Sequence, residues 1–278
     1  DCSRLCARCS SSQDQSSTAT ITVNPLPSAT ISGTTAVCRT APSPYITFTG
    51  SGGTTPYTFT YTINSGENRT VSSTPGNSIA SVAAPTGTVG SFTYSLVSVR
   101  DGGGTACSQA QSGSATITVN PLPTAMVSGT TAVCRNASPP NITFTGANGT
   151  PPYTFTYNIN GGANINVATI GENSSVSVSV PTGTAGSYTY NLLSVTDGSI
   201  TTCSQAQSGS ATVTVNPLPT ATISGATAVC QNASSPNITF TGASGTAPYT
   251  FTYQINNGTN LTVTTTGGNS INVPVPTN

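Results

Sequence analysis

The chain has very few charged residues and contains no lysine, histidine or tryptophan. Charged residues make up 4% of its 278 positions, with six arginines against six acidic residues, whereas about a quarter of a globular protein is usually charged. No charged side chain follows Asp197. Because histidine and lysine supply much of the acid, base and nucleophilic chemistry of enzymes, their absence excludes most catalytic mechanisms.

The sequence also lacks long apolar runs and clusters of one charge. The net charge is zero and the arginines are scattered, so there is no basic stripe to bind a phosphate backbone, and we expect no nucleic-acid partner. No window approaches roughly eighteen consecutive apolar residues, which predicts no membrane insertion in this segment. The first residues do not have the pattern of a signal peptide. We therefore expect a mature or excised piece.

What the sequence does contain is a repeat of 96 residues. The tetrapeptide Asn-Pro-Leu-Pro begins at Asn24, Asn120 and Asn216, and Ile-Thr-Phe-Thr-Gly recurs with the same spacing of 96. A unit of this size is too long for a solenoid repeat and is typical of a domain with its own core. The predicted organisation is a cysteine-rich N-terminal segment plus the last strand of a preceding repeat at 1–24, complete repeats at 25–120 and 121–216, and an incomplete repeat at 217–278.

Within each repeat, apolar residues alternate with hydroxyl residues. Tyr57, Phe59 and Tyr61 alternate with threonines, and Ile117 and Val119 do the same, which is the period-two pattern of strands with one buried face. About seven such runs per repeat, separated by Gly, Pro and Asn turn clusters, predict an all-β fold of tandem immunoglobulin-like β-sandwich domains in a linear rod. The serine- and threonine-rich composition is also compatible with disorder, but the regular stripes favour a folded chain.

Four cysteines repeat with the domains and suggest two disulfides. Cys38 and Cys134 are 96 residues apart, as are Cys107 and Cys203, so we predict the bonds Cys38 to Cys107 and Cys134 to Cys203, near one end of each sandwich. Closing a loop of about 70 residues stabilises a domain by roughly 4 kcal/mol in the chain-entropy model. Such bonds predict an oxidising, extracellular compartment. Reduced, buried thiols are the alternative.

Cys9 and Cys230 remain as unpaired or intersubunit candidates. The segment 16–27 repeats the end of a domain, so we interpret Cys9 as the remnant of a disulfide in a preceding repeat. Cys2, Cys6 and Cys9 also have a spacing similar to the cluster loop of radical enzymes that use S-adenosylmethionine. In those enzymes the loop follows a strand of an α/β barrel, and here it precedes β-rich repeats. No cofactor is predicted.

Other candidate site residues do not combine into a catalytic or metal site. Asp101 and Asp197 hold equivalent places beside glycine, where aspartate commonly supports a turn, and calcium needs more oxygen ligands than one carboxylate provides. Glu67 and Glu172 do not share a repeat position, and no histidine is present to activate a serine. We predict no catalytic residue, no metal and no enzymatic activity.

Several spaced motifs recur in register with the repeat. They are Val37-Cys38, the Gly-x-x-Pro-Tyr of 53–57, the run 92–101 before Cys107, and 115–123. Together they resemble the immunoglobulin-like tandem repeats of large Bacteroidetes cell-surface adhesins of the gliding-motility type, over all three repeats. The resemblance implies secretion to the bacterial cell surface and service as a stalk or filament, with adhesive activity often located elsewhere in the chain.

Two functional hypotheses follow. Near-identical repeats joined by proline-rich segments favour a structural component of an extracellular bacterial filament or adhesin stalk. The alternative is a ligand-binding adhesin module that recognises a surface glycan or protein through its loops. A surface with almost no charge lacks the repulsion that keeps monomers apart, so we also expect self-association into a filament or a longer repeat array.

The third repeat is expected to lack its final two strands and a partner for Cys230. An unfinished sandwich exposes unpaired strand edges. Either the native chain continues as a longer array, which we favour, or a neighbouring subunit inserts the strand at 19–23 in the manner of donor-strand complementation.

Overall fold

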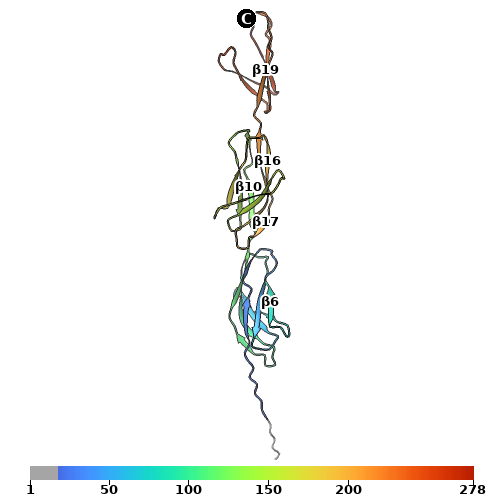
Figure 1. Ribbon diagram of the computed structural model, residues 1–278, viewed down its shortest axis with the longest axis vertical. Coiled ribbons are helices and arrows are strands. Elements are labelled where there is room, and N and C mark those ends of the chain that lie inside the picture. Colours follow the sequence, from blue (N-terminus) through green and yellow to red (C-terminus); the bar gives the residue numbers. More distant parts are fainter. Residues whose placement is uncertain (1–17) are drawn as a thin grey trace, which may run out of the picture. The chain divides into compact units, whose positions relative to one another are not determined.

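The computed structural model describes residues 18–278, which form strands and turns without a helix (Figure 1). Of these residues, one compact unit comprises 18–35, 42–85 and 90–118, and a second comprises 36–41, 86–89 and 119–278. Cys2, Cys6 and Cys9 lie outside the described residues.

The first complete repeat contains nine strands, all within the described residues. One sheet has the order β1-β3-β6 and the other the order β2-β9-β7-β4-β5, with β8 paired to β7. The strands are β1 (Ser28–Ser32), β2 (Thr35–Cys38), β3 (Tyr45–Ser51), β4 (Thr58–Ile63), β5 (Arg69–Ser72), β6 (Ile79–Ala83), β7 (Gly90–Arg100), β8 (Ser108–Ala110) and β9 (Ser114–Asn120).

The second complete repeat has the same topology. Its sheets have the orders β10-β12-β15 and β11-β18-β16-β13-β14, with β17 paired to β16. The strands are β10 (Thr124–Ser128), β11 (Thr131–Cys134), β12 (Asn141–Ala147), β13 (Thr154–Ile159), β14 (Ile165–Ala168), β15 (Ser175–Ser179), β16 (Gly186–Thr196), β17 (Ser204–Ala206) and β18 (Ser210–Asn216).

Aromatic side chains hold the two sheets of each repeat together. Phe48 on β3 stacks on Phe59 of β4 with ring centroids 5.6 Å apart, and it contacts Tyr61 at 5.1 Å. Phe144 on β12 makes the equivalent contact with Phe155 of β13 at 5.8 Å. The threonines between these aromatics face outward, so the period-two stripe read from the sequence is the core of each sandwich.

The third repeat has a three-stranded sheet and a separate hairpin. The sheet has the order β19-β20-β23 and the hairpin pairs β21 with β22; the strands are β19 (Thr220–Ser224), β20 (Asn237–Ala243), β21 (Thr250–Tyr253), β22 (Leu261–Thr264) and β23 (Ser270–Pro274). Phe240 still stacks on Phe251 at 5.6 Å. Ile223 on β19 is 63% exposed.

The prediction of an all-β chain of tandem β-sandwich domains is confirmed. Each complete repeat has nine strands rather than about seven, because the structure includes very short strands. β2 has four residues and β8 has three, too few to show an alternating pattern in the sequence.

Candidate functional site

The one disulfide among the described residues joins two successive repeats. It links Cys38, which ends β2 in the first repeat, to Cys203, which precedes β17 in the second. The two Cα atoms are 5.6 Å apart across a sequence separation of 165 residues. Both cysteines belong to the second compact unit.

The predicted bond between Cys134 and Cys203 is wrong because these residues lie at opposite ends of one sheet. Cys134 ends β11, at the end of the sheet where β16 begins at Gly186. Cys203 precedes β17, which pairs with the last residues of β16, ending at Thr196. The 11 residues of β16 span roughly 35 Å at about 3.3 Å per residue, whereas a disulfide needs Cα atoms within about 7 Å.

The predicted bond between Cys38 and Cys107 is wrong for the same reason. Cys38 ends β2, and Cys107 precedes β8, which pairs with the last residues of the 11-residue strand β7. Cys38 is instead bonded to the next repeat. Cys107 is a free thiol of intermediate exposure, and Cys134 and Cys230 are free and exposed.

A buried carboxylate shapes the loop that presents Cys203. Asp197 is 4% exposed, and its Oδ1 accepts hydrogen bonds from the Ser199 hydroxyl at 2.7 Å and from the Cys203 N–H at 2.9 Å. Its Oδ2 accepts from the Thr150 N–H at 3.3 Å. The turn role expected for this aspartate is confirmed, since Oδ1 also accepts from the Ser199 N–H two residues on.

A second set of hydrogen bonds connects this loop to the end of the first repeat. The side-chain amide of Asn120 donates to the Thr201 hydroxyl at 2.9 Å, and Thr201 lies 3.2 Å from the bonded sulfur of Cys203. Asn120 opens the second Asn-Pro-Leu-Pro motif. The recurrence of this asparagine at every repeat end was the sequence signal for its role, which the sequence analysis missed.

The loop 101–107 of the first repeat has the same turn but fewer bonds to its aspartate. The side-chain amide of Asn24 donates to Thr105 at 2.8 Å, and Oδ2 of Asp101 accepts from the Thr54 N–H at 3.2 Å. Oδ1 of Asp101 is buried without a partner. Ser199, whose hydroxyl donates to Asp197, has Gly103 as its counterpart in the first repeat.

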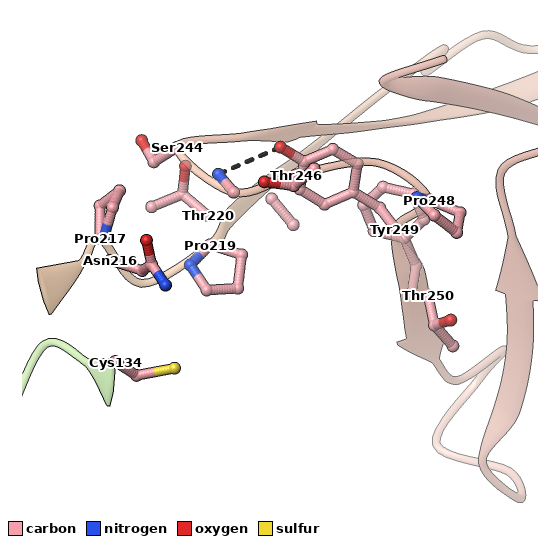
Figure 2. A pocket seen from close by; sticks show the side chains of 13 residues that line it. Cys134, Asn216, Pro217, Pro219, Thr220, Ser244, Thr246, Pro248, Tyr249 and Thr250 are labelled. Carbon is pink, nitrogen blue, oxygen red and sulfur yellow. Dashed lines mark hydrogen bonds between the residues drawn. The ribbon is translucent and has the colours of Figure 1, made fainter. Parts of the chain in front are cut away.

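A hollow of about 660 Å³ lies in the second unit beside Cys134. Figure 2 shows Cys134 on one side of this hollow and Asn216, Pro217 and Pro219 next to it, with Tyr249 accepting a hydrogen bond from the Gly245 N–H at 3.1 Å. Cys134 and Asn216 are the counterparts of Cys38 and Asn120. Cys38 and Asn120 contact the loop that holds Cys203 in the next repeat. The hollow lies at the corresponding place beside Cys134 and Asn216.

The described residues include three free thiols, those of Cys107, Cys134 and Cys230. Within 18–278, no three His, Cys, Asp or Glu side chains lie close enough to hold a metal ion. No helix in that part of the chain is long and apolar enough to cross a membrane. Burial raises the pKa of the Tyr94, Tyr157 and Tyr190 phenols, which keeps these core side chains neutral.

Comparisons with known proteins give limited matches. Residues 5–77 match a family model described as type II transport protein GspH, which covers well under half of the chain and partly falls on residues that are not described. No curated protein matches the chain.

Several solved structures are similar in fold. A Ca²⁺-stabilised adhesin with which an Antarctic bacterium binds ice is 21% identical, with a TM-score of 0.42 over 89% of this chain and 65% of that one. The ICAM-5 D1–D4 ectodomain is 13% identical, with a TM-score of 0.37 over 86% and 67%. Fibronectin(III)-like modules of Clostridium thermocellum CbhA are 12% identical, with a TM-score of 0.30 over 68% and 94%. The chain thus spans less than two thirds of the adhesin structure, and these values assign neither a family nor a function.

Proposed function

We propose that the chain is a structural segment of an extracellular bacterial stalk or filament that transmits tension. The observation that carries this proposal is the disulfide between Cys38 and Cys203, which ties one β-sandwich repeat to the next. When the chain is pulled from its ends, such a bond carries the force directly from the first repeat to the second and shields the residues between the two cysteines from extension. A disulfide also fits secretion into an oxidising compartment.

The segment before the first repeat supports a longer array. Ala-Thr-Ile-Thr-Val occurs at 19–23 and again in β9. In β9 the side chain of Ile117 is fully buried, whereas Ile21 is 90% exposed. The segment 19–23 forms no strand here, and its alternating apolar residues are of the kind that a sandwich would bury. We propose that a preceding repeat of the same polypeptide supplies this sandwich, so that the chain is part of a longer repeat array.

Binding of a surface glycan or protein through the loops remains the competing function. The aromatic side chains that such ligands favour are mostly in the core here: all four aromatic residues of β4 and β13 are buried. The stalk role accounts for both the disulfide and the inward-facing aromatics.

Immunogold electron microscopy of intact producing cells tests the stalk. With antibodies raised against residues 121–216, we expect gold particles outside the cell envelope, along surface fibres. Label that appears only after permeabilisation would contradict the proposal. A glycan array probed with the same chain separates the alternative, because a spacer gives no saturable signal on any glycan.

A further inference from the structure

The disulfide joins two kinds of cysteine in a fixed direction. The bonded residue of the first repeat ends the sequence Thr-Ala-Val-Cys, which recurs at Cys134 and Cys230. The bonded residue of the second repeat begins Cys-Ser-Gln-Ala, which also occurs at Cys107. Each complete repeat therefore has one cysteine of each kind, at opposite ends of its longest strand.

Cys107 lies in a loop that is built for the second kind of bond. The Asp101 N–H donates to the Cys107 carbonyl at 3.0 Å, as the Asp197 N–H does to the Cys203 carbonyl at 3.0 Å. The contact from the preceding Asn-Pro-Leu-Pro asparagine, here Asn24, is also present. The loop is thus formed although its cysteine is free.

One buried atom in this loop has no partner. Asp101 is 6% exposed, and its Oδ1 accepts no hydrogen bond. In the bonded loop the Cys203 N–H donates a hydrogen bond to the equivalent oxygen, Oδ1 of Asp197, at 2.9 Å, and Cys203 is fully buried. Buried carboxylate oxygens are normally paired, so the loop around Cys107 has an unfilled position that a small inward movement of Cys107 would fill.

We propose that Cys107 is a bonding site for the cysteine that ends a Thr-Ala-Val-Cys strand of another repeat, and that closing this bond brings the Cys107 N–H onto Oδ1 of Asp101. This proposal rests on the proposed stalk, because the stalk supplies the neighbouring repeat that holds the partner cysteine. The two thiols lose two protons and two electrons to a small-molecule disulfide such as oxidised glutathione, which leaves as two thiols.

The direct test supplies the missing repeat within the same polypeptide. Residues 1–24 are replaced by a second copy of residues 25–120, and the protein is refolded in a glutathione redox buffer. Peptide mapping by mass spectrometry without reduction should find Cys38 of the added copy linked to Cys107, alongside the original bond from Cys38 to Cys203. Amide exchange at Cys107 should slow by roughly tenfold or more, as expected for a newly formed hydrogen bond.

The matched control is the same extended chain with Cys107→Ser. It should retain the bond from Cys38 to Cys203, which shows that the repeats fold, and should leave the cysteine of the added copy open to alkylation. The proposal is overturned if Cys107 stays alkylatable in the extended chain while the Cys38 to Cys203 bond forms, or if Cys107 bonds with Cys38 of its own repeat.

A second arm identifies the source of the partner cysteine. The original chain is oxidised at increasing concentration, and cross-linked peptides are mapped. A link from Cys107 to Cys134 or Cys230 of another molecule would support the bonding site and name a second copy as its source. Formation of the bond only in the extended chain assigns it to consecutive repeats of one polypeptide. Both results are independent of surface labelling, so the bonding site and the stalk can fail separately.

Discussion

At the scale of single residues, one carboxylate in each complete repeat organises a cysteine loop, and one of the three positions at which the two loops differ lies two residues after the aspartate. Asp197 accepts a hydrogen bond from the Ser199 hydroxyl, whereas the equivalent position beside Asp101 is Gly103. A Cβ at Gly103 would lie 3.7 Å from Oδ1 of Asp101, an ordinary contact distance. The backbone of this loop therefore has room for the missing hydroxyl.

Exchanging these two residues should shift stability in opposite directions. We expect Ser199→Gly to lower the free energy of unfolding by about 1 to 2 kcal/mol, because a charged acceptor loses its shortest hydrogen bond. Gly103→Ser should raise it by about 1 kcal/mol by giving Oδ1 of Asp101 a donor. Urea denaturation of the two variants and the parent chain measures both changes. A destabilised Gly103→Ser variant would show that the loop cannot accept the side chain.

At the scale of strands, the same five-residue pattern occurs in two environments. Ile117 on β9 is fully buried between the sheets, and Ile21 in the equivalent position of the N-terminal segment is 90% exposed. Replacing a buried isoleucine by alanine removes apolar contacts and leaves a cavity.

This pair provides a matched test of the core. Ile117→Ala should destabilise the first repeat by about 2 to 4 kcal/mol, and Ile21→Ala should change stability by less than about 0.5 kcal/mol. Thermal unfolding followed by circular dichroism compares the two variants. An equal loss in both would mean that the segment 18–27 is packed against a sandwich in solution.

The strand pattern was predictable from the sequence, but the cysteine pairing was not. Alternation in Tyr57, Phe59 and Tyr61 specifies which side chains face the core, because successive residues of a strand point to opposite faces. The 96-residue spacing shows that Cys38 resembles Cys134 and that Cys107 resembles Cys203, yet it does not show at which end of the sheet each pair lies. That depends on the length and register of the 11-residue strands β7 and β16.

The hydrogen-bond network around the loops was also beyond sequence analysis. The asparagine of each Asn-Pro-Leu-Pro motif was visible as a repeated residue, but its contact, Asn120 to Thr201, spans 81 positions. Oδ1 of Asp101 lacks both donors that Oδ1 of Asp197 has, the Ser199 hydroxyl and the Cys203 N–H, although both turns begin with the same Asp-Gly pair. Such effects depend on atomic positions that residue periodicity does not determine.

At the scale of the whole molecule, the scarcity of titratable groups should make stability nearly independent of pH over a wide range. The chain has no histidine and no lysine, so few groups besides thiols and the terminal amine titrate between about pH 6 and 9. As the pH rises further, the next groups to titrate are the tyrosines. Desolvation by burial raises the pKa of Tyr94, Tyr157 and Tyr190 above the ordinary value of 10.0.

These tyrosines set the alkaline limit of the fold. Above about pH 10 the unfolded chain releases phenol protons that the folded chain still holds, so the free energy of unfolding should fall as pH rises further. Chemical denaturation of thiol-blocked protein should show a plateau from about pH 6 to 9 and a decline beyond it. Tyr157→Phe should make the decline less steep. A decline of unchanged slope in that variant would rule out this tyrosine as a contributor.

Mechanical extension tests the consequence of joining repeats covalently. The disulfide encloses a sequence separation of 165 residues, so when the two ends of the chain are pulled the force passes through the bond and the enclosed residues are not extended. At about 3.4 Å per residue, the bond hides roughly 560 Å of contour length. Single-molecule force spectroscopy should therefore give a total extension shorter by about that length in oxidising buffer than after reduction. Cys203→Ser should reach the full length without reductant, and Cys107→Ser, which removes a free thiol, should behave as the parent chain. If the parent chain reached the full length in oxidising buffer, the bond between successive repeats would be absent from the folded protein, and the proposed role in transmitting tension would lose its support.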